Sequence, residues 1–242
     1  MMNFIRNRKK ITAILGISVV LLLLAIIIVF KYKAKAINVT GNKIVSSEEI
    51  MANYTKGPFG DNRLVIKAKD KLNAFDTIPF VRDYDIRYEE DGTVTIQIYE
   101  KALVACFYYM GEYVYFDKDG VILETSKETT PGIPCIEGVS FKNFTMNTRI
   151  NIDNPDQIKM ILDLSELINH YSINVEKVRF DNNYEVTLYS HGIRVMLGKK
   201  KLYDQQIASV TDVLNQSIEN NLKGTIDMKT YSKGDKIILK QQ

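Results

Sequence analysis

A chain of 242 residues is long enough for two small domains that each bury a hydrophobic core. The net charge of +3 misrepresents most of it, because seven of the 32 basic residues and none of the 29 acidic residues lie among the first 35, which leaves 25 basic residues beyond them. That mildly acidic remainder lacks the positive surface that phosphate backbones require, so composition argues against a nucleic-acid partner.

Residues 11–30 form an apolar run with no ionisable side chain, interrupted only by Thr12, Gly16 and Ser18. A helix rises ~1.5 Å per residue, so this run covers the ~30 Å hydrocarbon core of a bilayer. The alternative is a buried helix of a globular domain, which would show a polar stripe. Because residues 19–30 are apolar on every face, the sequence favours one transmembrane helix in the lipid bilayer.

The flanks of this run are basic on both sides, with four basic residues before it and three after it. The positive-inside rule therefore favours a cytoplasmic N-terminus by a small margin. A cleaved signal peptide is the alternative, since Ala34-Lys35-Ala36 fits an A-x-A cleavage site, but the apolar run is long for a signal peptide. We expect a cytoplasmic tail at 1–10, a retained anchor at 11–30 and extracytoplasmic domains beyond.

A first domain over residues 36–104 shows the pattern strand, helix, helix, strand, strand. Ser46 and Glu49 form a capping box for a helix to about Tyr54. A second helix is predicted where apolar residues recur at helical spacing up to Pro79. Two alternating runs then flank an Asp91-Gly92 turn and predict a hairpin. The apolar positions of that second helix are Ala68, Leu72, Phe75 and Ile78.

A second domain over residues 105–242 begins with strands at 104–109, 113–116 and 121–123. The Asp117-Lys118-Asp119-Gly120 segment between the last two fits a hairpin turn better than a calcium loop, which needs a third alternating oxygen ligand and a Glu at its twelfth position. We expect a mixed α+β fold with an antiparallel sheet. Its later elements are a helix from Asn154-Pro155, strands at 175–180, 184–189 and 193–197, a helix from Tyr203 to about Leu222 ended by Gly224, and a closing hairpin of 225–229 with 236–240.

Two helices on one face of a three-stranded sheet is the arrangement of a POTRA-type module, and the motifs sharpen this resemblance. The first domain resembles the POTRA region of the bacterial division proteins FtsQ and DivIB, which reads V-x-G-N, S-x-E-E-I, P-x-V and I-x-V-x-E before P-V-A. The sequence departs from this pattern where Ile98 replaces a valine and Leu103-Val104-Ala105 replaces Pro-Val-Ala. The segments that carry the resemblance are 37–42, 46–50, 78–81 and 93–101.

The second domain is also similar to this family. Residues 131–138 resemble its L-P-x-I-x-G segment, and Ile226-Asp227-Met228 matches its Ile-Asp-Met or Val-Asp-Leu strand near the C-terminus. The resemblance implies a non-catalytic divisome scaffold, enriched at the division septum in the cell membrane. Its implied partners are small single-span coiled-coil proteins of the FtsL and FtsB or DivIC type, and its implied role is to couple septum assembly to peptidoglycan synthesis.

Catalytic chemistry has little support in the sequence. His170 and His191 are the two histidines, and neither lies in a motif for a general base or a metal, so we predict no catalytic residue, metal, cofactor or small-molecule substrate. Cys106 and Cys135 are too few for a disulfide scaffold or an unaided zinc site. One bridge between them remains open, and two buried thiols is the interpretation that we favour.

A C-terminal edge strand is the candidate binding site, because an edge strand offers unpaired backbone groups to a partner strand. The alternative is an ordinary closing strand whose lysines discourage pairing, and the resemblance favours partner docking. Two functions compete with the scaffold: a POTRA-bearing envelope or secretion component that binds polypeptides by strand addition, and an anchored cell-wall enzyme. The candidate residues are Tyr231, Lys236, Ile237, Ile238, Leu239 and Lys240.

Overall fold

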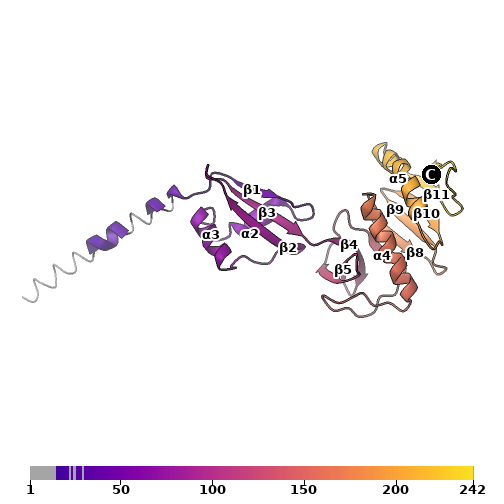
Figure 1. The fold of residues 1–242 in the computed structure, drawn as a ribbon, viewed down its shortest axis with the longest axis horizontal. Helices are drawn as coiled ribbons and strands as arrows, with labels where there is room; N and C mark the ends of the chain where they lie inside the picture. The colour runs from indigo at the N-terminus through magenta and orange to yellow at the C-terminus, as the bar shows by residue number, and fades with distance from the viewer. Residues whose placement is uncertain (1–14, 22, 24–25, 29, 242) are drawn as a thin grey trace, which may run out of the picture. The chain divides into compact units, whose positions relative to one another are not determined.

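A computed structural model describes residues 15–241 except 22, 24, 25 and 29, and the chain divides into two compact units between Glu100 and Lys101 (Figure 1). Within this described part of the chain, no helix is both long and apolar enough to cross a membrane. The predicted anchor at 11–30 lies partly outside the described residues.

The first unit holds the predicted order of strand, helix, helix, strand and strand. Strand β3 lies in the centre of its sheet, parallel to β1 and antiparallel to β2. The alternating residues Val94, Ile96 and Ile98 of β3 are buried, as are Ile50 and Ile66 of the two helices. The elements are β1 (Ile37–Thr40), α2 (Ser47–Tyr54), α3 (Arg63–Lys71), β2 (Val81–Tyr88) and β3 (Val94–Glu100).

The ends of the two helices follow from local hydrogen bonds. The Ser46 side chain accepts from the Glu49 backbone N–H and caps α2 as predicted. Helix α3 was predicted to run on to Ile78, and this is wrong: it ends at Lys71. Asn73 takes a left-handed conformation at φ 49° and closes the helix in a Schellman-type turn, so Phe75 and Ile78 reach the core from a loop.

The second unit is built on a nine-strand sheet in the described residues, with β12 at one edge and β6 at the other. The strand order across it is β12-β11-β10-β9-β8-β7-β4-β5-β6. The strands are β4 (Leu103–Tyr109), β5 (Glu112–Asp117), β6 (Ile122–Ser126), β7 (Cys135–Glu137), β8 (Lys177–Phe180), β9 (Val186–Ser190), β10 (Ile193–Gly198), β11 (Gly224–Asp227) and β12 (Leu239–Gln241).

This sheet is mixed, and the predicted antiparallel sheet is therefore wrong. Strand β7 runs parallel to both β4 and β8, and β10 runs parallel to β11. For the pairs β7–β8 and β10–β11 the reason is connectivity, because helix α4 (Pro155–His170) joins β7 to β8 and helix α5 (Asp204–Glu219) joins β10 to β11. A helical crossover returns the chain to the same end of the sheet and makes the two strands parallel.

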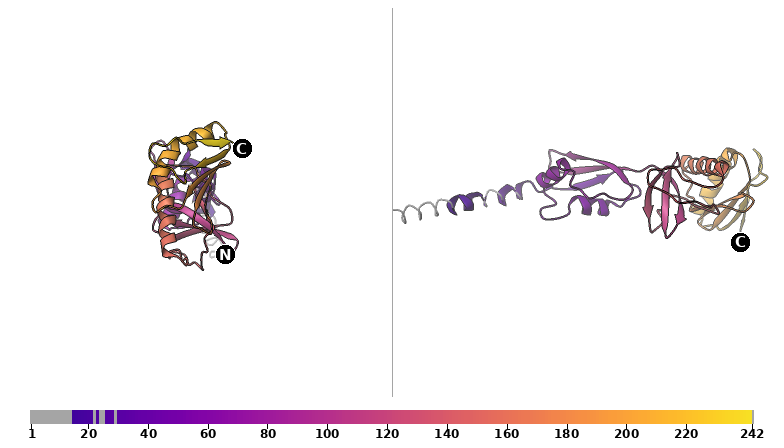
Figure 2. Two further views of the ribbon diagram at one scale, coloured as in Figure 1. Left: turned by 90° about the vertical axis from the view of Figure 1, so that its right-hand side faces the viewer. Right: turned by 90° about the horizontal axis from the view of Figure 1, so that it is seen from below.

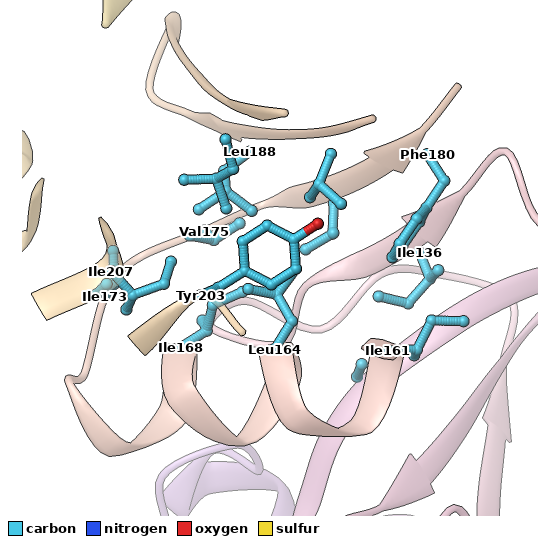
Figure 3. Packing of buried hydrophobic residues seen from close by; sticks show 14 of the residues in the cluster. Ile136, Ile161, Leu164, Ile168, Ile173, Val175, Phe180, Leu188, Tyr203 and Ile207 are labelled. Atoms are coloured by element: carbon cyan, nitrogen blue, oxygen red, sulfur yellow. The ribbon is translucent and has the colours of Figure 1, made fainter. Parts of the chain in front are cut away.

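Both helices lie along one side of the strands (Figures 1 and 2). Helix α4 begins at Pro155 with the Asn154 side chain accepting from the Asp156 backbone N–H, as the sequence predicted. Its residues Ile161, Leu164 and Ile168 point toward the strands, with the ring of Tyr203 among them (Figure 3). The two helices thus cover one face of the sheet, and no other helix occurs among the described residues of the second unit.

Candidate partner-binding site at the C-terminal edge

Strand β12 forms one edge of the nine-strand sheet and is three residues long. It pairs antiparallel with β11, with Thr225 opposite Lys240 and Ile226 opposite Leu239. In the described residues no further strand pairs with β12, so its outer edge is open. A short edge strand with charged flanks is how proteins limit unwanted pairing, yet its open backbone groups can still accept a partner strand.

Gly224 permits this edge to form. A Cβ built on Gly224 would lie 2.2 Å from the Lys240 carbonyl oxygen, and the residue sits at φ 152°, outside the usual range of L side chains. The sequence predicts that Gly224 ends the preceding helix in a left-handed conformation, and this is wrong. Asn221, at φ 52°, takes that position, while Gly224 opens β11 and lets β12 approach closely.

The segment between the two strands is longer than the predicted hairpin. Strand β12 begins at Leu239 instead of Lys236, so residues 228–238 form an irregular connection. The predicted turn at 232–235 is present: Gly234 has φ 101°, and the Asp235 carboxylate accepts from the Ser232 backbone N–H at 2.8 Å. This local bond folds the connection back toward the sheet.

The six predicted binding residues divide into two groups. Tyr231, Ile237 and Leu239 are half-buried and pack against the hydrophobic core of the second unit, so they hold the segment in place. Lys236, Ile238 and Lys240 are exposed, and Ile238 keeps 55% of its surface accessible. The structure thus places one apolar and two cationic side chains where a partner could contact them.

Two side-chain interactions hold residues 228 and 229, where the connection from β11 to β12 begins. The buried side chain of Gln206 donates through Nε2 to the backbone carbonyls of Leu197 and Met228, which joins α5 to the ends of β10 and β11. The Lys229 ammonium pairs with Glu185, and this hydrogen bond raises the pKa of Lys229. Sequence reasoning missed Gln206, although it lies four residues before Val210 on the buried side of α5 and could have been found by that spacing.

Lys240 also ends a row of side chains that crosses the whole sheet. Each member is the register partner of the next, so all point to one face, which is the face opposite the two helices. Within this row the Arg194 guanidinium donates to the Thr225 hydroxyl at 3.1 Å. The row runs Lys240, Thr225, Arg194, Tyr189, Lys177, Cys135, Cys106, Tyr115 and Glu124.

Comparison with known proteins identifies the family of this chain. A family model described as "Cell division protein FtsQ/DivIB, C-terminal" matches residues 108–229, half of the chain. The chain belongs to the FtsQ/DivIB family. The cell division protein DivIB of Clostridium acetobutylicum is 25% identical to it over 214 residues, which cover 87% of this chain and 84% of that protein.

The FtsQ/DivIB match covers the end of β4 through β11 and both helices of the second unit, so most of the sheet and both helices lie within the matched region. The match ends at Lys229, before the segment 230–241 that carries the predicted binding residues. The case for this edge as the binding site therefore rests on its geometry. In the part of the chain that the structure describes, no group of three His, Cys, Asp or Glu side chains is placed to hold a metal ion.

Proposed function

We propose that this member of the FtsQ/DivIB family is a non-catalytic divisome scaffold that binds small single-span coiled-coil proteins of the FtsL and FtsB or DivIC type. In this proposal it couples septum assembly to septal peptidoglycan synthesis. The observation that carries the proposal is the open outer edge of β12 in a chain of a cell-division family. A partner segment adds to this edge as a further strand, and alternate side chains supply specificity.

The exposed residues of the edge suit an extended, acidic-apolar partner segment. Ile238 offers an aliphatic contact beside Lys236 and Lys240, which can pair with carboxylates on the partner. The neighbouring side chains of Ile237 and Leu239 are half-buried and pack against the core, so the edge is ordered before the partner arrives. An ordered edge reduces the entropic cost of binding.

The rest of the proposed architecture supports this role. The apolar run 11–30 serves as a single-pass anchor with a cytoplasmic N-terminus, and the unit of residues 36–100 serves as a POTRA domain, both outside the family match. An anchor confines the chain to the same membrane plane as single-span partners and raises their effective concentration. The division septum is the proposed location.

Substitution of Ile238 tests the proposed edge. In the intact chain, Ile238→Lys places a charge on an exposed side chain without opening the core, so we expect co-purification of co-expressed FtsL-type and DivIC-type proteins to fall at least about tenfold while the fold is kept. Leu202→Lys is the matched control, because Leu202 is an aliphatic side chain in the same unit that is 70% exposed. Equal recovery with both variants would move the docking site away from β12.

A further inference from the structure

Cys106 and Cys135 are direct register partners on the adjacent parallel strands β4 and β7, although 28 residues separate them in the chain. Both are free thiols, and Cys106 is fully buried while Cys135 is partly exposed. Adjacent strands lie about 4.8 Å apart, and disulfides span Cα separations of about 4.4–6.8 Å. The two cysteines therefore stand where a disulfide can form without refolding of the sheet.

The thiols already interact with each other, and they are chemically unequal. The proximity of the Cys135 sulfur, together with burial, raises the pKa of the Cys106 thiol. The neighbouring Cys106 thiol lowers the pKa of Cys135; burial and the Glu137 carboxylate oppose this shift, and Lys177, the register partner of Cys135 in β8, supports it. Cys135 is thus the better nucleophile of the pair, since the thiolate is the reactive form.

Cys135 has a route to solvent through an open pocket. Cys135 lines an open pocket of ≈ 720 Å³ whose walls include Tyr108, Lys127 and Lys177. Cys106 does not line it and is covered by its neighbours, among them Tyr115, its register partner on β5. A reagent that enters the pocket therefore reaches Cys135 first.

We propose that Cys106 and Cys135 form a redox-active dithiol that closes to a disulfide with soluble organic disulfides. The Cys135 thiolate attacks the organic disulfide, forms a mixed disulfide and releases one thiolate. The Cys106 sulfur, as its proton leaves, then attacks the Cys135 sulfur and releases the second thiol. Two cysteine thiols are oxidised, one organic disulfide is reduced to two thiols, and the two protons go to those products or to solvent.

The bond would link β4 to β7, the neighbouring strands of the large sheet that share the fewest register pairs. Strand β7 has three residues and pairs with β4 at two positions, Cys106 with Cys135 and Phe107 with Ile136. The pairing of β7 with β4 connects the strands β4, β5 and β6 to the rest of the sheet. A covalent link across it restricts the unfolded chain and should raise the melting temperature of the second unit, by about 10 °C for a loop of this length. This inference does not depend on the proposed partner binding.

Glutathione disulfide is the probe for the test, applied to the intact, reduced chain in detergent. We expect the loss of both free thiols, a mass decrease of two hydrogen atoms with no bound glutathione, and a Cys106–Cys135 cross-linked peptide after digestion. Dithiothreitol should restore both thiols. A stable glutathione adduct on the unsubstituted chain, or no reaction within the folded chain, would each overturn the proposal.

Two single variants test the order of attack. Cys106→Ala removes the resolving sulfur, so Cys135 should retain one glutathione. Cys135→Ala leaves only the buried sulfur, and we expect it to react at least about tenfold more slowly than Cys135 does in Cys106→Ala. Faster reaction at Cys106 would contradict the assigned roles, whatever either variant does to stability, provided that far-ultraviolet circular dichroism shows both to be folded.

Discussion

Glu100 shows how one side chain organises the first unit. Its Oε1 atom accepts from three successive backbone N–H groups, those of Lys43, Ile44 and Val45, at 3.0, 2.8 and 2.9 Å. Successive N–H groups that converge on one point form an anion-binding nest, and hydrogen bonds to a charged acceptor are stronger than neutral ones. The carboxylate at the end of β3 thus fixes the loop that leads into α2.

Replacing this carboxylate should destabilise the first unit selectively. We expect Glu100→Ala to lower its free energy of unfolding by about 2 kcal/mol, because three N–H groups lose their acceptor and only some of them can turn to water. Hydrogen exchange at the Val94–Ile98 amides reports on this unit alone. Glu90→Ala, in the exposed turn between β2 and β3, is the control. A decrease in the free energy of unfolding no larger than that of the control would show that the nest is dispensable.

At the scale of single elements, β12 depends on the missing side chain of Gly224. We expect Gly224→Ala to displace β12 and to speed hydrogen exchange of the Leu239–Gln241 amides at least about tenfold, since the added methyl group would meet the Lys240 carbonyl. Gly111→Ala is the matched control, because Gly111 also has a positive φ, 98°, but a Cβ there meets nothing within 4 Å. Unchanged exchange in Gly224→Ala would mean that the close approach is not needed.

An element could be predicted from the sequence where the residues that determine it lie close together in the chain. The alternation of Tyr84, Ile86 and Tyr88 predicted β2 correctly, and Asn154-Pro155 predicted the start of α4, because both signals are contained in a few residues. Helix α3 was predicted too long, since the apolar spacing of Leu72 continues the helical pattern while the left-handed turn at Asn73 ends it. Leu72 is consequently exposed at 77%.

The topology of the whole second unit was less accessible from the sequence. The strands were found singly, but their neighbours depend on contacts between residues far apart, such as Cys106 with Cys135 and Ile226 with Leu239. The candidate edge was predicted in outline, because an apolar C-terminal run indicates a strand. Its true length, the role of Gly224 and the division between half-buried Ile237 and exposed Ile238 needed the packed structure.

For the whole molecule, the proposal is that a division protein recruits a partner strand at one end of its nine-strand sheet. The two ends of the sheet are not equivalent. Strand β6 is followed by a segment whose backbone pairs with it in part, as in the bonds from Asn147 to Ile122 and from Ile122 to Thr148. Strand β12 has no such cover among the described residues, so it is the edge more open to a new strand.

Hydrogen exchange of the intact chain, with and without its co-purified FtsL-type and DivIC-type proteins, tests this proposal most directly. Strand addition predicts that the partners slow exchange of the Leu239–Gln241 amides, because outward N–H groups gain acceptors, while the amides of β6 at the opposite edge keep their rates. Partner binding that leaves 239–241 unprotected, or that protects β6 instead, would contradict docking at the C-terminal edge.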